Sequence, residues 1–184
     1  MRILQKIKEI DVKTSHFFPQ FYHHRFFSGA MKFIAGIGDF GMIWLVLILL
    51  LSLNDKTQLL SQKMLAALIL ATVIGQVTIK SIVRRKRPCH TYHDVEMLIP
   101  VPSDYSFPSG HTTSSFACAT TVCFFFPRVG FICMIFAALM AFSRLYLFVH
   151  YLSDVTFAIV LGISVGIIVM SVSYTHLRAH ETEA

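Results

Sequence analysis

The sequence is short of charged residues, and that shortage decides the class of protein. Asp, Glu, Lys and Arg make up only 14% of the 184 residues, whereas charged residues are about a quarter of a soluble globular domain. Hydrophobic residues account for 55%, and the mean hydropathy is +0.64. An ordinary soluble domain is therefore excluded, and the length suits a single membrane-embedded bundle.

Cysteine is scarce as well, so no disulfide framework is indicated. Three of the four cysteines lie inside apolar stretches, where we expect them to pack as small hydrophobic residues: Cys118, Cys123 and Cys133. The fourth, Cys89, opens the run CHTYH, which could form a metal site, but no further ligands stand at zinc-like spacing. We therefore expect no metal and no cofactor.

The few charges that are present are mostly basic, with a net charge of +6. They gather in two runs, MRILQKIKEIDVK near the start and KSIVRRKRP in the middle of the chain. Such runs indicate anionic partners, and in an apolar chain we expect lipid headgroups and phosphates rather than nucleic acid. No oligomeric state is predicted.

The distribution of apolar residues predicts an all-α integral membrane bundle that forms a single domain over residues 1–172. Residues 1–25 alternate apolar and charged positions at helical spacing, which is typical of an amphipathic helix at the membrane surface rather than a cleavable signal peptide. Five apolar segments follow that are suited to membrane-spanning helices. They cover residues 33–53, 64–83, 108–126, 129–143 and 154–172.

The composition changes abruptly in the tail, residues 173–184, which contains SYTHLRAHETEA from Ser173 onward. This run resembles a peptide produced when sequencing-adapter DNA is translated at the end of a reading frame. We therefore expect a non-native tail and exclude its histidines from the site. The alternative is an ordinary polar tail.

Ionisable residues at membrane depth indicate function by default, and the first such group is KSIVRRKRP. Lys80 and Arg87 are seven residues apart, so a helix would present both on one face, with Arg84 between them. Pro88 then ends the helix. The alternative is a basic anchor for anionic lipid beside the membrane.

The second group is FPSGHTTSSF, at the start of an expected span. Pro108 suits the first turn of a helix, and Gly110 lets the backbone approach a ligand closely. The free N–H groups of that turn favour a phosphate, with His111 beside it. The alternative is a capped helix with an interfacial histidine.

The third group is SRLYLFVHYLSD, which contains Ser143, Arg144, His150 and Asp154. His150 and Asp154 have the i, i+4 spacing that places two side chains on one helix face. Asp154 would then accept the Nδ1 proton of His150 and leave Nε2 bare. The alternative is an ion pair at the membrane edge. Combined, the three groups predict phosphoryl transfer without a metal, with cations on the phosphoryl oxygens and two histidines for attack and protonation.

These residues resemble the three-part signature of the type-2 phosphatidic acid phosphatase family, which includes bacterial undecaprenyl pyrophosphate phosphatases and vanadium haloperoxidases. The family's motifs are Lys, six residues, Arg-Pro; Pro-Ser-Gly-His; and Ser-Arg, five residues, His, three residues, Asp. The matching residues are Lys80, Arg87 and Pro88, then Pro108, Ser109, Gly110 and His111, then Ser143, Arg144, His150 and Asp154.

The resemblance implies roles for these residues. His150 would be the nucleophile that forms a phosphohistidine, Asp154 would orient it, and His111 would protonate the leaving group and then activate water. The residues implied to hold the phosphoryl oxygens are Lys80, Arg87, Arg144, Ser109 and the amide of Gly110.

Small size, five spans and the run GDFG…W are most similar to bacterial undecaprenyl pyrophosphate phosphatases. The expected reaction is therefore metal-independent release of phosphate from undecaprenyl pyrophosphate. The alternatives are a phosphatidylglycerophosphate or phosphatidic acid phosphatase, a vanadate-dependent haloperoxidase, and a non-catalytic lipid-binding protein. In the family's bacterial members the site usually faces outward from the plasma membrane, so we expect an extracytoplasmic site, although the basic runs on that side favour the cytoplasm.

Overall fold

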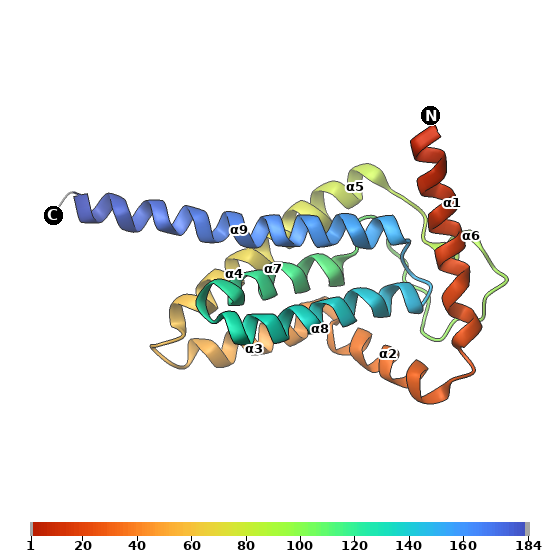
Figure 1. Cartoon of the computed structure of the whole chain (residues 1–184), viewed down its shortest axis with the longest axis horizontal. Helices are drawn as coiled ribbons and strands as arrows, with labels where there is room; N and C mark the ends of the chain where they lie inside the picture. Colours follow the sequence, from red (N-terminus) through yellow and green to blue (C-terminus); the bar gives the residue numbers. More distant parts are fainter. Residues whose placement is uncertain (1, 183–184) are drawn as a thin grey trace.

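The computed structural model describes residues 2–182, with side chains described for residues 2–172. The side chains of the tail 173–184 lie outside the described residues, so its expected origin stays a prediction. Within the described part the chain is helical (Figure 1), which confirms the all-α class. The main helices are α1 Arg2–Phe17, α2 Arg25–Ile37, α3 Met42–Ser52, α4 Gln58–Ala71, α5 Lys80–Val83, α6 Pro88–Thr91, α7 Gly110–Phe125, α8 Pro127–Tyr146 and α9 Leu152–Thr182.

The short helix α7 is the centre of the bundle, packed between α4, α8 and α9. Small residues let α9 come close to it: a Cβ at Gly162 would lie 2.6 Å from the Thr113 carbonyl oxygen, and one at Gly166 would lie 2.6 Å from Thr120 Cβ. On the other side the indole N–H of Trp44 in α3 donates to Ser115 Oγ at 3.0 Å. Small and hydroxyl residues of this kind are typical of close helix packing in membranes.

Three described helical stretches are long and apolar enough to cross a membrane: Gln58–Thr91, Pro127–Tyr146 and Leu152–Val172. The bent pair Arg25–Ile37 and Asp39–Ser52 makes a fourth if it counts as one span. The third expected span differs, because residues 108–126 form the 16-residue α7, and about 20 apolar residues are needed for a span. Its neighbours enclose α7, so most of its side chains never meet lipid and need not be apolar.

The first expected span, 33–53, is broken at Asp39. Helix α2 ends at Ile37, and a 3-10 turn, Asp39–Gly41, leads into α3 at a bend of 49°. Phe40 and Gly41 have positive φ angles of 54° and 71°, which an α-helix cannot accommodate. Asp39 therefore lies at a break in the helix rather than inside it.

The expected continuous helix from Lys80 to Arg87 is also wrong. Helix α4 continues through a π-helical segment, Thr72–Ile79, into α5, which ends at Val83. Arg84 takes the left-handed conformation, with φ 47°, and the chain then runs without helix to Arg87. Pro88 disfavours helical geometry in the residue before it, which agrees with the extended backbone of Arg87.

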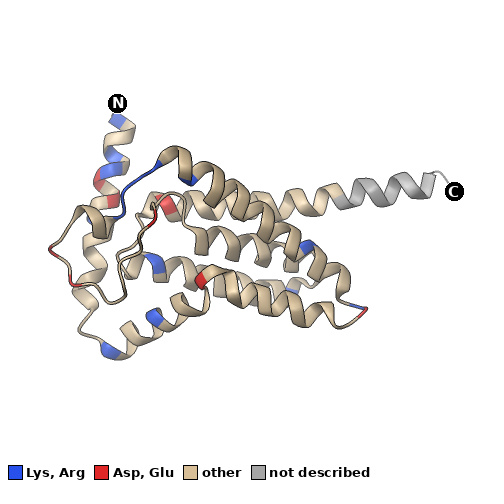
Figure 2. Cartoon of the chain, turned by 180° about the vertical axis from the view of Figure 1, so that it is seen from behind, with Lys and Arg blue, Asp and Glu red and all other residues tan. Residues whose placement is uncertain are grey.

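Helix α1 lies across the end of the bundle, against the start of α9 (Figure 1). Ile3, Leu4 and Ile10 are exposed on it, whereas Asp11 is buried against the protein. The exposed apolar side chains agree with the predicted amphipathic helix, and its position in the membrane interface stays a prediction. Figure 2 shows Lys and Arg residues gathered near this end, while the long helices are mostly uncharged.

Candidate active site

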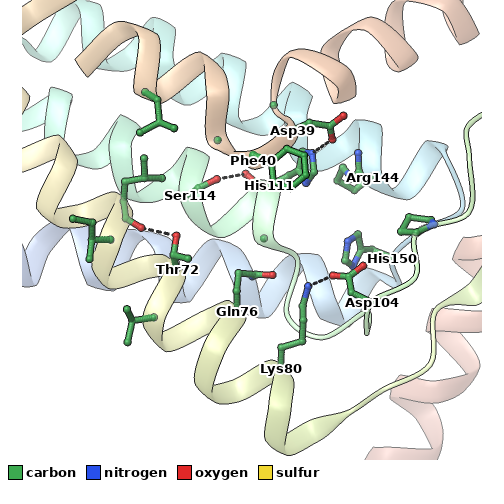
Figure 3. Close-up of a pocket in the computed structure, with 18 of the residues that line it drawn as sticks. Asp39, Phe40, Thr72, Gln76, Lys80, Asp104, His111, Ser114, Arg144 and His150 are labelled. Atoms are coloured by element: carbon green, nitrogen blue, oxygen red, sulfur yellow. Dashed lines mark hydrogen bonds and ion pairs between the residues drawn. The ribbon is translucent and has the colours of Figure 1, made fainter. Parts of the chain in front are cut away.

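A cavity of about 840 Å³ opens beside α7 and is polar at one end (Figure 3). All the predicted site residues line it except Ser109 and Asp154. Its polar end is formed by Lys80, Arg87, Asp104, His111, Arg144 and His150. Residues that are up to 70 positions apart in the sequence (Lys80 to His150) therefore meet in one space.

His150 is held in a defined tautomer by Arg87. The ring is 2% exposed and lies in the turn before α9. Its Nε2 is 2.9 Å from Arg87 Nη1. A guanidinium can only donate, so Nε2 must accept and the ring proton belongs on Nδ1. The lone pair of Nε2, which would attack a phosphorus atom, therefore faces a cation at the polar end of the cavity.

Asp154 lies behind His150 in the first turn of α9, where it is fully buried. The predicted shared helix face is wrong, because His150 precedes the helix. The carboxylate Oδ2 is 3.7 Å from His150 Nδ1, which is an ion-pair distance but too long for a hydrogen bond. Nδ1 is buried without a hydrogen-bond partner. Asp154 instead accepts from the Tyr151 amide at 2.9 Å and from Arg85 at 2.6 Å.

The surroundings of His150 favour its neutral form. Burial lowers the pKa of the imidazole, and the positive charges of Arg87 and Arg144 lower it further. A neutral imidazole keeps the lone pair that nucleophilic attack requires. The position of His150 thus suits a nucleophile at physiological pH.

A carboxylate that the sequence did not single out occupies the cationic end. Asp104 accepts from Lys80 Nζ and from Arg87 Nη2, each at 2.6 Å, as part of the loop before α7 (Figure 3). Partial burial alone would raise the pKa of Asp104, but the hydrogen bond from Lys80 and the charge of Arg87 outweigh it and lower the pKa to about 2. Asp104 is therefore an anion at any ordinary pH, held where a phosphate group would bind.

Arg144 differs from Lys80 and Arg87 in having no carboxylate partner among the described residues. It is 4% exposed, and its Nε is buried without a hydrogen-bond partner. Among the described residues no carboxylate lies within ion-pair distance of it. A buried cation that faces a cavity and has no carboxylate partner is suited to binding an anion.

The start of α7 differs from the prediction in two details. Pro108 precedes the helix instead of lying in its first turn, because Ser109 is the N-cap residue. The Ser109 hydroxyl is paired with Thr112 Oγ1 at 2.9 Å, and Ser109 does not line the cavity. Gly110 does line the cavity, where a Cβ would lie 2.8 Å from Cδ of Gln76. Gln76 belongs to the π-helical segment, a form that is frequent at functional sites, and its Nε2 is buried without a partner.

His111, one residue further along, also has a carboxylate partner. Its Nε2 lies 2.9 Å from Asp39 Oδ1, at the break between α2 and α3 (Figure 3). No local pattern indicates this pair, because the two residues are 72 positions apart.

Five large aliphatic side chains line another part of the cavity wall. It follows α3, α4 and the start of the π-helical segment, and most of these side chains also reach the outer surface. They are Leu45, Leu65, Leu68, Ile69 and Val73. The cavity therefore combines a cationic end with an apolar wall, which fits a molecule with an anionic head and a hydrocarbon chain.

Comparison with known proteins agrees with this geometry. The sequence model of the PAP2 superfamily matches residues 62–178. An undecaprenyl-diphosphatase from Sulfolobus acidocaldarius is 30% identical over 136 residues, which are 73% of this chain and 65% of that protein. A decaprenylphosphoryl-5-phosphoribose phosphatase from Mycobacterium tuberculosis is 40% identical over 106 residues, 57% of each chain. The matches thus span only about three fifths of the length of these relatives.

Among solved structures, the fold is similar to a transmembrane PAP2-type phosphatidylglycerolphosphate phosphatase from Bacillus subtilis. The TM-score is 0.76 at 23% identity, with 92% of this chain and 87% of that one covered. Together with the apolar helices, this likeness identifies a multi-pass membrane protein.

Proposed function

Because this chain belongs to the PAP2 superfamily, we propose that it is a lipid phosphatase that hydrolyses a lipid pyrophosphate or phosphate ester through a phosphohistidine. The observation that carries the proposal is the cavity itself. Its polar end contains His111, a neutral His150 and an Arg144 whose Nε has no hydrogen-bond partner. Apolar side chains line the wall that leads away from this end. A headgroup phosphate would bind at that end while the hydrocarbon chain lies along α3 and α4.

The proposed reaction has two steps. Nε2 of His150 leaves Arg87 and attacks phosphorus, so a P–N bond forms while the bond to the leaving oxygen breaks and His111 gives that oxygen a proton. His111 then takes a proton from water, whose oxygen attacks phosphorus and breaks the P–N bond. Lys80, Arg87 and Arg144 neutralise the phosphoryl oxygens in both steps, and no metal ion is required.

Undecaprenyl pyrophosphate is the substrate that we propose first. The relative from Sulfolobus acidocaldarius is an undecaprenyl-diphosphatase, and the apolar wall of the cavity suits an isoprenoid chain. Purified protein in detergent should release phosphate from undecaprenyl pyrophosphate in the presence of EDTA, and vanadate should inhibit the release. Phosphatidylglycerophosphate and phosphatidic acid complete the panel. A strict magnesium requirement would contradict the metal-free mechanism, and no release from any of the three lipids would contradict the proposed function.

A separate prediction concerns Asp104, which in the proposed mechanism competes with the substrate phosphate for binding to Lys80 and Arg87. The change Asp104→Asn removes the charge but keeps the shape, so the two cations become available to an external oxyanion. We expect the inhibition constant of vanadate to fall on the order of 10-fold, a modest gain because the Asp104 side chain is half exposed to solvent. Inhibition assays measure it, with Asp94→Asn, a change at an exposed position of the same loop, as the control. Weaker vanadate binding in Asp104→Asn would show that Asp104 helps to hold the anion.

We further propose that the site faces the outside of the plasma membrane. The candidate site residues lie near the end of the bundle that contacts α1, because Arg85, two residues before Arg87, donates to Asp11 of α1. The side of the membrane is open to test. Cys89 lies in the short helix α6 and is only 6% exposed, so it is unsuited to labelling. An exposed cysteine introduced as His93→Cys, with the other four cysteines replaced, should react with an impermeant thiol reagent on whole cells. Labelling only after lysis would place the site in the cytoplasm.

A further inference from the structure

A second polar network lies directly behind Asp154, on the side away from the cavity. Its centre is Arg85, which is not part of the predicted site. Arg85 Nη1 donates to Asp154 Oδ1 at 2.6 Å and to Ser153 Oγ at 2.7 Å. Nη2 donates to Asp11 Oδ2 at 2.7 Å. One guanidinium therefore joins the carboxylate behind His150 to the N-terminal helix α1.

Asp11 closes this network into a ring. Its two carboxylate oxygens accept from the Ser153 amide at 2.8 Å and from the Ser153 hydroxyl at 2.6 Å, in addition to Arg85. The Asp11 side chain is 2% exposed and that of Asp154 is 0% exposed. Two buried carboxylates are thus held by one shared cation, and both carboxylates accept further hydrogen bonds, which is the condition under which buried charges are tolerated.

The plane of the guanidinium is fixed as well. Its carbon lies 4.0 Å from the ring centre of Tyr151, the residue that follows His150. The fork of an arginine holds two carboxylates at set directions, which a lysine ammonium cannot do. Asp154 consequently has one oxygen fixed by Arg85, while the other accepts from the Tyr151 amide and faces His150 Nδ1.

We propose that Arg85 is a positioning residue for the nucleophile and that Asp11 acts through it. Arg85 keeps Asp154 charged and aimed at His150, so that the carboxylate can stabilise the imidazolium character that develops when Nε2 attacks phosphorus. Asp11 holds Arg85 and the turn at Ser153 in place. The pair His150 and Asp154 is thereby connected to α1, the helix predicted to lie at the membrane surface. This role rests on the proposed phosphatase function.

The test compares kcat and KM for Arg85→Gln with those of a matched neighbour, Arg84→Gln. Arg84 is exposed, and its only described side-chain hydrogen bond goes to the Ser81 carbonyl. We expect Arg85→Gln to lower kcat on the order of 10²-fold, because the carboxylate behind the nucleophile is misplaced. KM and the vanadate inhibition constant should stay within about twofold of wild type, since the phosphate-binding cations are untouched. Arg84→Gln should match wild type in all three.

Asp11→Asn supplies the second arm. We expect a smaller loss, about 10-fold in kcat, and no further loss when Asp11→Asn is added to Arg85→Gln, because Asp11 acts through Arg85. Wild-type kcat in a folded Arg85→Gln protein would overturn the role of Arg85, as would additive losses for Asp11. If Arg85→Gln does not fold, Asp11→Asn decides alone, and a wild-type kcat overturns the proposal. A wild-type protein without activity on any lipid phosphate would instead overturn the proposed function.

Discussion

Replacing His150 with alanine should abolish phosphate release, with kcat at least about 10³-fold below wild type. The reason lies in the geometry around Nε2. This nitrogen is the unprotonated one, since it accepts from Arg87 Nη1 at 2.9 Å, and the carboxylate of Asp154 lies on the other side of the ring. No other described histidine has both contacts, so none can substitute for His150 as the nucleophile.

The same variant should leave anion binding almost unchanged. Lys80 and Arg144 do not depend on His150 for their positions, because no hydrogen bond joins either to it. KM should therefore change less than kcat, which is the pattern expected when an interaction made only in the transition state is lost. The matched control is His93→Ala, an exposed histidine in the loop between α6 and α7, which should keep wild-type kinetics.

Trapping the phosphoenzyme tests directly whether His150 is the nucleophile. Wild-type protein quenched during turnover should carry an acid-labile, base-stable phosphoryl group on His150, and His150→Ala should carry none. His111→Asn should accumulate the phosphoenzyme with a substrate whose leaving group needs no proton, because the water that hydrolyses it lacks its base. Substantial turnover by His150→Ala, or an acid-stable phosphoenzyme, would contradict the assignment.

The sequence predicts which residues come together better than it predicts their local structure. Lys80, Arg87, His111, Arg144 and His150 all line one cavity, as expected. The predicted helix faces that were to bring them together are wrong, however. Arg84 leaves the helix in a left-handed conformation, and His150 lies in a turn before α9. Side-chain convergence here comes from tertiary packing around α7, which overrides the local periodicity from which helix faces are predicted.

The partners of these residues could not be predicted. Asp104 meets Lys80 across 24 positions, Asp39 meets His111 across 72, and Asp11 meets Arg85 across 74. Each pair is made by elements whose relative placement no local pattern encodes. A carboxylate in a basic membrane chain is a weak signal that it has a cationic or histidine partner, since unpaired charges are costly there. That signal indicates that a partner exists but not which one.

Arg144→Gln should lower kcat/KM by about 10²- to 10³-fold, the cost typical of losing one donor that stabilises charge in the transition state. Although this loss of activity is large, Arg144→Gln should not lower the thermal stability of the protein. Arg144 is 4% exposed, its Nε has no partner, and no described carboxylate pairs with it. Such a cation is a cost to the folded protein until a phosphate arrives, so removing it should leave Tm unchanged or raise it.

Arg87→Gln is the matched comparison and should behave oppositely in stability. Arg87 is equally buried but donates four hydrogen bonds, to Asp104 O, Asp104 Oδ1, Val149 O and His150 Nε2. Removing it breaks a buried network and leaves these acceptors unsatisfied, so Tm should fall by at least about 5 °C while kcat/KM falls as for Arg144→Gln.

Thermal unfolding in detergent, followed with and without vanadate, measures both variants. Vanadate should raise the Tm of the wild type, because a ligand that binds only the folded state stabilises it. The rise in Tm should be smaller in both variants. A drop in Tm for Arg144→Gln as large as that for Arg87→Gln would show that Arg144 is held by the protein rather than kept free for substrate.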